Sequence, residues 1–184
     1  MDQNLIHALL TRRSLKPKYL TLPAPSAEEL TLCARTALRA PVHGVGFPCR
    51  FVLVPEEKRD RLAGLLKQAA VDAGLDETAQ AKAKSKARKG PQIVAFVVND
   101  TVGVNRTESL LTAGAALEQF LLALKALGYG AITLSGSVLA NETVQAAFCK
   151  APGEKLLGWL TVGTPVEGVS YEEETGEAPF GVWE

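Results

Sequence analysis

Residues 108–127 read ESLLTAGAALEQFLLALKAL, and this stretch decides the fold. It is apolar on nearly every side of a helix, because its strongly polar residues are few: Glu108, Glu118, Gln119 and Lys125. A helix without a polar face lies in a protein core or beneath another subunit. We therefore expect this helix to be the central packing element of the chain.

Strands are expected on both sides of this helix in the sequence. The run QIVAFVV (92–98) precedes it, and its continuous apolar character predicts burial on both faces. Gly128 and Gly130 end the helix, and AITLSG (131–136) then begins another strand. Two further strand candidates are RFVLV (50–54) and LLGWLTV (156–162).

Shorter helices are expected between these strands. Ser26 and Glu29 form a capping box, which predicts a helix that ends at Pro41. Asn141 is placed to cap a helix over 142–149. An N-terminal helix is expected over 3–12, with Ile6, Leu9 and Leu10 on one face. A helix after Pro55 is expected to bury Leu62, Leu65, Leu66 and Ala69. A weakly anchored surface helix is expected within 76–90.

The segment between the first two helices is expected to be an extended, basic loop. Its prolines, Pro17, Pro23 and Pro25, disfavour regular structure there. With no repeat and no linker in the sequence, residues 1–184 are expected to form one domain. The expected class is α+β, with a central mixed sheet flanked by helices.

The charge distribution is uneven along the chain although the net charge is zero. Residues 1–91 carry 16 basic and 9 acidic side chains, whereas residues 92–184 carry 4 basic and 11 acidic ones. A uniformly basic nucleic-acid-binding protein is thereby excluded. The hydrophobic content of 47% is that of an ordinary globular protein and excludes disorder over most of the chain.

Cysteine usage and hydropathy indicate where the protein works. Cys33, Cys49 and Cys149 are odd in number and far apart, so neither a disulfide scaffold nor a structural zinc site is expected. The N-terminus is too polar for a signal peptide, and no uncharged apolar stretch is long enough to cross a membrane. We expect a cytoplasmic protein without a membrane or nucleic-acid partner and without a bound metal.

The first candidate site is Arg12-Arg13-Ser14, where a helix gives way to the proline-bearing loop. Arginine presents a planar fork that matches phosphate oxygens, and the Ser14 hydroxyl can add a neutral hydrogen bond. A solvated surface patch would explain the same residues equally well. No acid–base pair of catalytic side chains is predicted anywhere in the chain.

Two more segments are candidates for ligand contact. Arg39 and His43 lie on the turn that follows a helix, and His43 is either a surface residue or a ligand-binding group. Thr133, Leu134, Ser135 and Gly136 end a buried strand, where a ligand can approach the backbone closely. The alternative interpretation of this second segment is a simple turn.

Taken in order, these pieces resemble the FMN-dependent nitroreductase family, and in particular its short members. Five segments carry the resemblance across nearly the whole chain: RRS after an N-terminal helix, APVHG, KGPQIVAFVV, AGAALEQFLLALKALGYGAITLSG and LLGWLTVGTP. The resemblance implies an intertwined homodimer with FMN at the subunit interface. It also implies an NAD(P)H-dependent enzyme that reduces nitroaromatics, quinones or similar acceptors in a two-step flavin cycle.

The resemblance also implies roles for the candidate residues. Arg12 and Ser14 would hold the phosphate and ribityl end of FMN, with Arg13 nearby, and Arg39 and His43 would reach the flavin from the partner chain. Backbone groups of Thr133, Leu134, Ser135 and Gly136 would lie beside the isoalloxazine ring.

Departures from the family pattern leave other functions open. Short relatives often have Trp-Arg-Ser-Gly where residues 133–136 read TLSG, and many have a basic residue where Val166 and Glu167 follow Pro165. One alternative is therefore a dimeric flavin-binding protein with little turnover. Another is an interaction module that uses the basic run KAKSKARK (82–89) to bind an anionic partner.

The C-terminal tail is expected to pack onto something, because two aromatic residues interrupt an acidic segment. These are Phe180 and Trp183, among Glu172, Glu173, Glu174 and Glu177. In a dimer the tail could cross onto the basic half of the partner.

Overall fold

A five-stranded sheet lies between two layers of helices in the computed structural model, which describes residues 3–44, 46–172 and 176–183. The long strand β5 is central, since it pairs with β3, β4 and β1 along different parts of its length, while β2 pairs with β3. The strands are β1 (Leu20–Thr21), β2 (Cys49–Val54), β3 (Gln92–Asn99), β4 (Gly130–Leu134) and β5 (Glu154–Pro165).

The expected α+β class is confirmed, but the strand directions differ from the expectation. Each of the four strand pairings in the described part of the chain is antiparallel, where a mixture of directions was expected. Helical connections between β3 and β4 and between β4 and β5 allow either direction, so hydrophobic pattern alone could not fix it.

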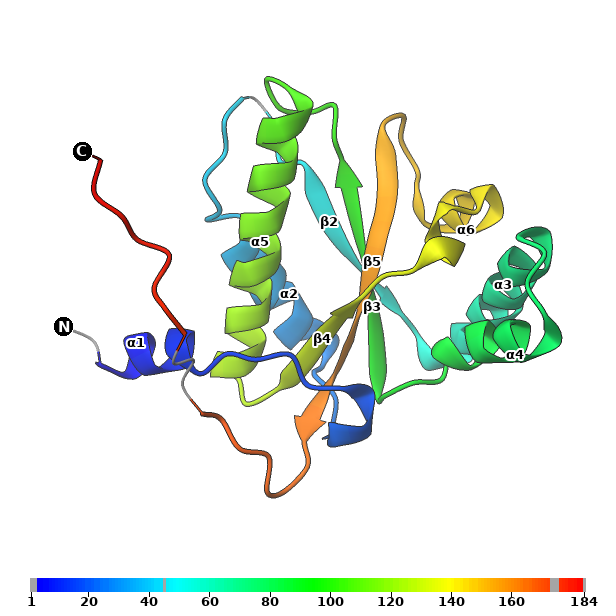
Figure 1. The fold of residues 1–184 in the computed structure, drawn as a ribbon, viewed down its shortest axis with the longest axis horizontal. Helices are drawn as coiled ribbons and strands as arrows, with labels where there is room; N and C mark the ends of the chain where they lie inside the picture. Colours follow the sequence, from blue (N-terminus) through cyan, green and yellow to red (C-terminus); the bar gives the residue numbers. More distant parts are fainter. Residues whose placement is uncertain (1–2, 45, 173–175, 184) are drawn as a thin grey trace.

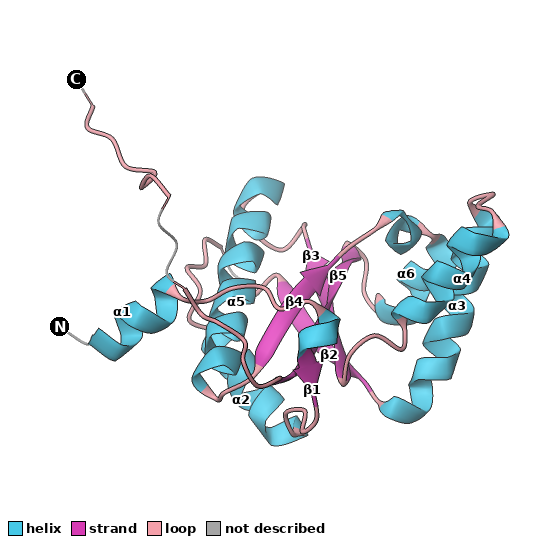
Figure 2. Ribbon diagram, turned by 60° about the horizontal axis from the view of Figure 1, so that its bottom comes forward, coloured by secondary structure: helices cyan, strands magenta, loops and turns pink. Residues whose placement is uncertain are grey.

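Strand β3 shows why helices are needed on both faces of the sheet. Residues 93–98 are all buried, as the apolar run predicted. Because successive side chains in a strand point to opposite faces, Ile93, Ala95 and Val97 join one core, and their neighbours Val94, Phe96 and Val98 join the other. The first core lies under α3 (Arg59–Asp72), α4 (Glu77–Lys86) and α6 (Glu142–Phe148), and the second under α2 (Ala27–Ala37) and α5 (Arg106–Ala126) (Figure 2).

Helix α5 is the packing element that its sequence predicted. Asn105 caps it by accepting a hydrogen bond from the Glu108 N–H, and its buried face packs on the sheet, where Phe120 stacks on Phe51 with ring centroids 4.0 Å apart. It is long and apolar enough to be a candidate membrane span by length and composition. Its other face leaves Leu110 and Leu111 exposed, so part of its apolar surface has no cover within one chain.

The capping box of α2 is present as predicted, with both hydrogen bonds between Ser26 and Glu29 formed. Two other expectations were wrong. The loop after the first helix contains a 3-10 turn and the short strand β1, because Leu20 and Thr21 meet the end of β5. Helix α4 is not weakly anchored, since Ala83 on the helix and Ala87 at its C-terminal cap are buried in the first core.

Apolar side chains also stand uncovered at both ends of the chain. Helix α1 (Gln3–Leu10) exposes Leu5, Ile6, Leu9 and Leu10. The tail extends away from the sheet next to α1 (Figure 1), and the side chains of Phe180 and Trp183 are 85% and 99% exposed. Within the described part of one chain these two aromatic side chains therefore have almost no cover.

Candidate functional site

The Arg12-Arg13-Ser14 segment lies beside the beginning of β4. The Leu15 N–H donates to the Ala131 carbonyl over 2.9 Å, which holds the segment against this strand. The Arg12 Nε atom lies 2.8 Å from Glu118 Oε1 on α5, and Arg13 donates to the Ser170 carbonyl of the tail over 3.2 Å. Ser14 is exposed.

Lys125 adds a third cation to this segment, and sequence reasoning missed it. Its ammonium donates to the Thr11 hydroxyl and lies 5.2 Å from the centre of the Tyr171 ring. Burial, together with the positive charge of Arg12, lowers the pKa of Lys125. Among the described residues, the ion pairs give these three cations one carboxylate, that of Glu118, so positive charge is in excess and favours a bound anion.

The other end of β4 opens into a cavity of about 120 Å³. Leu134 and Ser135 line it, and Trp159 and Thr161 of β5 form another wall. The remaining lining residues come from α3, β3 and the end of α4, namely Leu62, Leu66, Ile93, Lys86 and Lys89. The cavity is therefore apolar, with two ammonium groups at its edge.

Gly136 lies close to Lys86 at this end of the strand. A Cβ atom at position 136 would lie 3.3 Å from the Lys86 ammonium, closer than most Cβ contacts. The segment 135–137 also borders a wide open groove of about 770 Å³. A planar ligand beside Ser135 and Gly136 would thus have access from solvent.

The two cationic positions are separated by the length of β4. The arginine segment lies at Gly130 and Ala131 and the lysines at Ser135, a separation of roughly 15 Å at about 3.3 Å per residue. This arrangement suits an elongated ligand with an anionic group at one end and a ring at the other.

Lys86 and Lys89 were overlooked because the run 82–89 was interpreted as a solvated helix or as a separate anion-binding patch. Their three-residue spacing puts both on one side of a helical turn, and that spacing was the available signal. Neither lysine has a carboxylate partner among the ion pairs of the described residues.

Arg39 and His43 are not brought to the other candidate residues within one chain. Both are exposed at the end of α2, and His43 Nδ1 lies 3.7 Å from Glu108 Oε2 at the start of α5. Glu108 and Glu118 are ten residues apart on that helix, a distance of about 15 Å. One chain therefore forms only part of the expected site.

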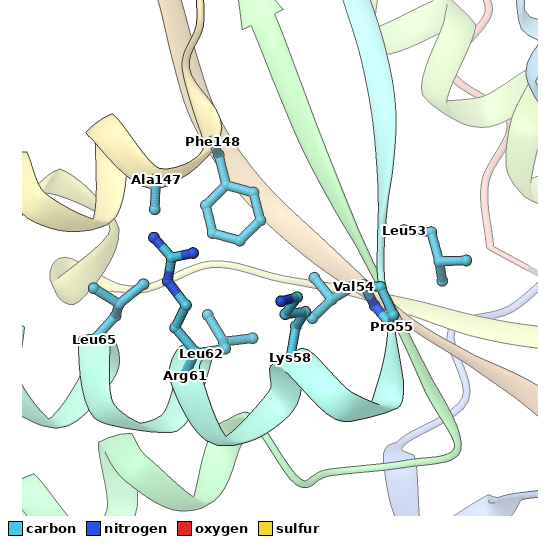
Figure 3. Close-up of a pocket in the computed structure, with 9 residues that line it drawn as sticks. All are labelled: Leu53, Val54, Pro55, Lys58, Arg61, Leu62, Leu65, Ala147 and Phe148. Atoms are coloured by element: carbon cyan, nitrogen blue, oxygen red, sulfur yellow. The ribbon is translucent and has the colours of Figure 1, made fainter.

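A second apolar cavity, of about 190 Å³, lies between the end of β2, the start of α3 and α6 (Figure 3). Lys58, just before α3, and Arg61 on α3 line it, and Arg61 is directed toward Ala147 and Phe148. None of the predicted site residues lines this cavity. It is separated from the first cavity by α3, whose Leu62 contributes to both.

The fold and the site together define an α+β protein with a cationic, partly apolar ligand site along one strand. A family model described as the Nitroreductase family matches residues 9–164. A protein named "Putative NAD(P)H nitroreductase YdjA" from Escherichia coli K12 is 33% identical over 162 residues, 87% of each chain. A Haemophilus influenzae protein that carries the same name without the gene symbol is 32% identical over 167 residues, 89% of this chain and 90% of its own.

Solved structures agree at the level of the fold. A nitroreductase-like family protein from Bacillus cereus superposes with a TM-score of 0.77 at 20% identity, over 97% of this chain and 93% of its own. A protein from Desulfovibrio desulfuricans, solved in complex with FMN, gives a TM-score of 0.67 at 22% identity, over 98% of this chain and all of its own. The chain belongs to the nitroreductase family.

Proposed function

We propose that this chain is a cytoplasmic, homodimeric oxidoreductase that binds FMN and uses NAD(P)H to reduce a small-molecule acceptor. The observation that carries the proposal is the pair of cationic positions at the two ends of β4, the second of which lies beside the segment Thr133–Gly136. The names of the two sequence relatives and the FMN complex of a structural neighbour support it.

The residues present fit the chemistry of FMN. Its phosphate would be held by Arg12 and Arg13 with help from Lys125, and the Ser14 hydroxyl would bond the phosphate or the ribityl chain. The apolar walls near Leu134 would take the flat ring, and the absence of a Cβ at Gly136 would let the ring approach the backbone.

A second copy of the chain completes the proposed site. The cavity at the end of β4 is about 120 Å³, below the roughly 300 Å³ at which small-molecule sites usually begin, so one chain would cover only part of a three-ring system. Arg39 and His43 of the partner subunit would contact the rest. The apolar side chains left exposed on α1 and α5 would be buried in the same dimer.

Bound FMN would supply the hydride-accepting and hydride-donating chemistry, first with NAD(P)H and then with the acceptor. The chain's own residues would orient the ring and adjust its electronic properties. Ammonium groups of Lys86 and Lys89 at the cavity edge would stabilise negative charge on the ring. They would also compensate for the cation that residue 134 lacks. Nitroaromatics, quinones and similar acceptors all suit an exchange of this kind.

The test begins with purified protein reconstituted with FMN. We expect a yellow protein that is bleached by NADH or NADPH without oxygen and regains its colour when a nitroaromatic or a quinone is added. A protein that binds FMN but is never bleached would support the alternative of a flavin-binding protein with little turnover. Failure to bind FMN under any reconstitution condition would contradict both functions.

A further inference from the structure

Arg59, the first residue of α3, has a buried guanidinium that contacts the loop after α4. Its side chain is 6% exposed. Its Nε donates to the Ala87 carbonyl over 2.8 Å, and its two Nη atoms donate to three more carbonyls and to the Glu56 carboxylate. The three carbonyls belong to Lys89, Gly90 and Pro91. All five N–H groups of the guanidinium are thereby used.

These bonds satisfy carbonyl groups at and beyond the end of α4. Ala87 is the C-terminal cap of α4, and carbonyls at a helix end have no partner within the helix. A planar guanidinium can bond several carbonyls in fixed directions at once, whereas an ammonium is a compact charge with three donors. Arg59 therefore fixes the backbone of residues 87–91.

The opposite side of the same loop is packed just as closely. Gly90 has a φ of +74°, and a Cβ atom there would lie 2.1 Å from Thr161 Cγ2 on β5. Thr161 also lines the cavity at the end of β4. The loop is therefore held between Arg59 and β5 and cannot shift without breaking one of the two contacts.

This loop carries Lys89 of the proposed flavin site and begins directly after the other lysine, Lys86. Lys86 is the last residue of α4, and the backbone carbonyl of Lys89 is one of those that Arg59 binds. Both lysines line the cavity. We infer that Arg59 is a positioning residue for the cofactor: by fixing the loop after α4, it sets where the two ammonium groups stand against the ring. This inference rests on the proposed function, which places FMN in this cavity.

A purely structural role for Arg59 makes a different prediction, and a double-mutant cycle separates the two. If Arg59 acts through the lysines, its effect on FMN affinity must disappear when the lysines are gone. If Arg59 only stabilises the fold, the effect on affinity must persist without them. A change in thermal stability alone would not distinguish these cases.

The experiment measures the FMN Kd by quenching of flavin fluorescence in the full chain. Arg59→Lys should raise the Kd roughly ten-fold, the scale on which residues that orient ligand-holding groups act in metal sites. In a Lys86→Met, Lys89→Met background the same substitution should change the Kd less than about two-fold. Arg61→Lys is the matched control, because Arg61 is on the same helix and faces the other cavity, and it should leave the Kd unchanged.

Glu56→Gln provides a second route if Arg59→Lys gives no soluble protein. The Glu56 side chain is 66% exposed and binds both the buried guanidinium, over 2.9 Å, and Arg88 of the same loop, over 2.8 Å. Its loss therefore loosens the hold of Arg59 and Arg88 on the loop without opening the core. A smaller rise in Kd that vanishes in the double-lysine background would support the inference. An unchanged Kd, or an equal rise in both backgrounds, would overturn it while wild-type FMN binding still supports the proposed function. Absence of FMN binding in the wild type would overturn both.

Discussion

The Arg12 guanidinium is already paired in the protein, and this sets what its removal should do. It forms an ion pair with Glu118. The Glu118 side chain is 48% exposed and that of Arg12 is 27% exposed. Arg12 is therefore held in a defined position at the start of β4 and can still meet a ligand from solvent.

Arg12→Ala should weaken FMN binding. Loss of a charge-assisted hydrogen bond costs about 1.5–3 kcal/mol, which corresponds to a roughly 10- to 150-fold higher Kd in fluorescence titration. Arg35→Ala, which removes an exposed arginine on α2, is the control and should leave the Kd unchanged. An Arg12→Ala protein with wild-type affinity would mean that the phosphate binds elsewhere.

The surroundings of Glu154 lower the pKa of its carboxyl group strongly. It binds Arg50 through both oxygens, at 2.7 and 2.8 Å, and accepts backbone N–H bonds from Lys150 and Ala151. The bonds to Arg50 are the main reason that its pKa falls from 4.5 to about 2. The pair ties β2 to the first residue of β5.

Glu154→Gln should lower the free energy of unfolding by about 1.5–3 kcal/mol near pH 7, because a charge-assisted pair is lost. A lowered carboxyl pKa stabilises the fold above the unfolded value and loses its contribution as the pH falls through the folded value. The difference from the wild type should therefore shrink between pH 4.5 and about pH 2 in urea unfolding. Glu167→Gln, at an exposed position, is the control and should leave the free energy of unfolding near pH 7 almost unchanged.

At the scale of elements, helix boundaries follow from local chemistry. The capping box of α2 is readable from Ser26 and Glu29 alone, because both hydrogen bonds lie within one turn. Strand β1 could not be read in the same way, since its two residues are a strand only through pairing with the end of β5. The anchoring of α4 likewise depends on Ala83 and Ala87 meeting a distant core.

Ser26→Ala should destabilise α2 and with it the whole protein. The Ser26 hydroxyl accepts the Glu29 N–H over 3.1 Å, and removal of such a cap costs about 1 kcal/mol. Urea unfolding at neutral pH measures the loss. Thr31→Ala removes a hydroxyl from the exposed side of the same helix and should change the free energy of unfolding by less than about 0.5 kcal/mol. Equal effects of the two substitutions would mean that the cap contributes nothing specific.

At the scale of the whole molecule, the candidate residues fall into two groups that one chain cannot join. Arg12 lies beside β4, and His43 lies near the far end of α5. The proposed dimer joins Arg12 of one protomer to His43 of its partner. This crossing can be tested without a structure of the dimer.

Mixed dimers of Arg12→Ala and His43→Ala chains should recover activity that neither variant has alone. If the two residues come from different chains, each mixed dimer holds one intact site and one doubly damaged site. Random mixing makes about half of the dimers mixed, so about a quarter of all sites should regain wild-type FMN affinity and turnover. If both residues served the same chain's site, mixing would restore nothing.

The exposed tail gives a separate prediction for assembly. Phe180 and Trp183 have almost no cover within the described part of one chain, and burial of each in a partner would contribute about 1.5–3 kcal/mol. Phe180→Ser with Trp183→Ser should raise the dimer Kd at least about ten-fold in sedimentation equilibrium. Val104→Ser, at an exposed apolar position in a loop, is the control.

Salt dependence separates the aromatic part of this assembly from the charged part. An acidic tail on a basic partner surface should give a dimer that weakens as salt is raised from 0.1 to 1 M, because screening shortens from about 10 to 3 Å. A dimer Kd that does not change with salt would contradict a contribution of the acidic tail to assembly and would leave the aromatic residues as its explanation. Glu173 and Glu174 of the acidic tail lie outside the described residues, whereas Glu172 and Glu177 lie within them.

The sequence by itself determined the helices, the caps at Ser26 and Asn141, the buried strand β3, the apolar helix α5 and membership of the family, because periodicity, capping and motif order are local or linear properties. Only the tertiary structure revealed that Lys125 lies near Arg12 and that Lys86 lies close to Gly136. Only the tertiary structure revealed, too, that Arg59 on α3 binds the loop after α4. It also showed that every strand pairing in the described residues is antiparallel. These features arise from contacts between residues tens of positions apart, and such contacts form only when the sheet brings its neighbours together.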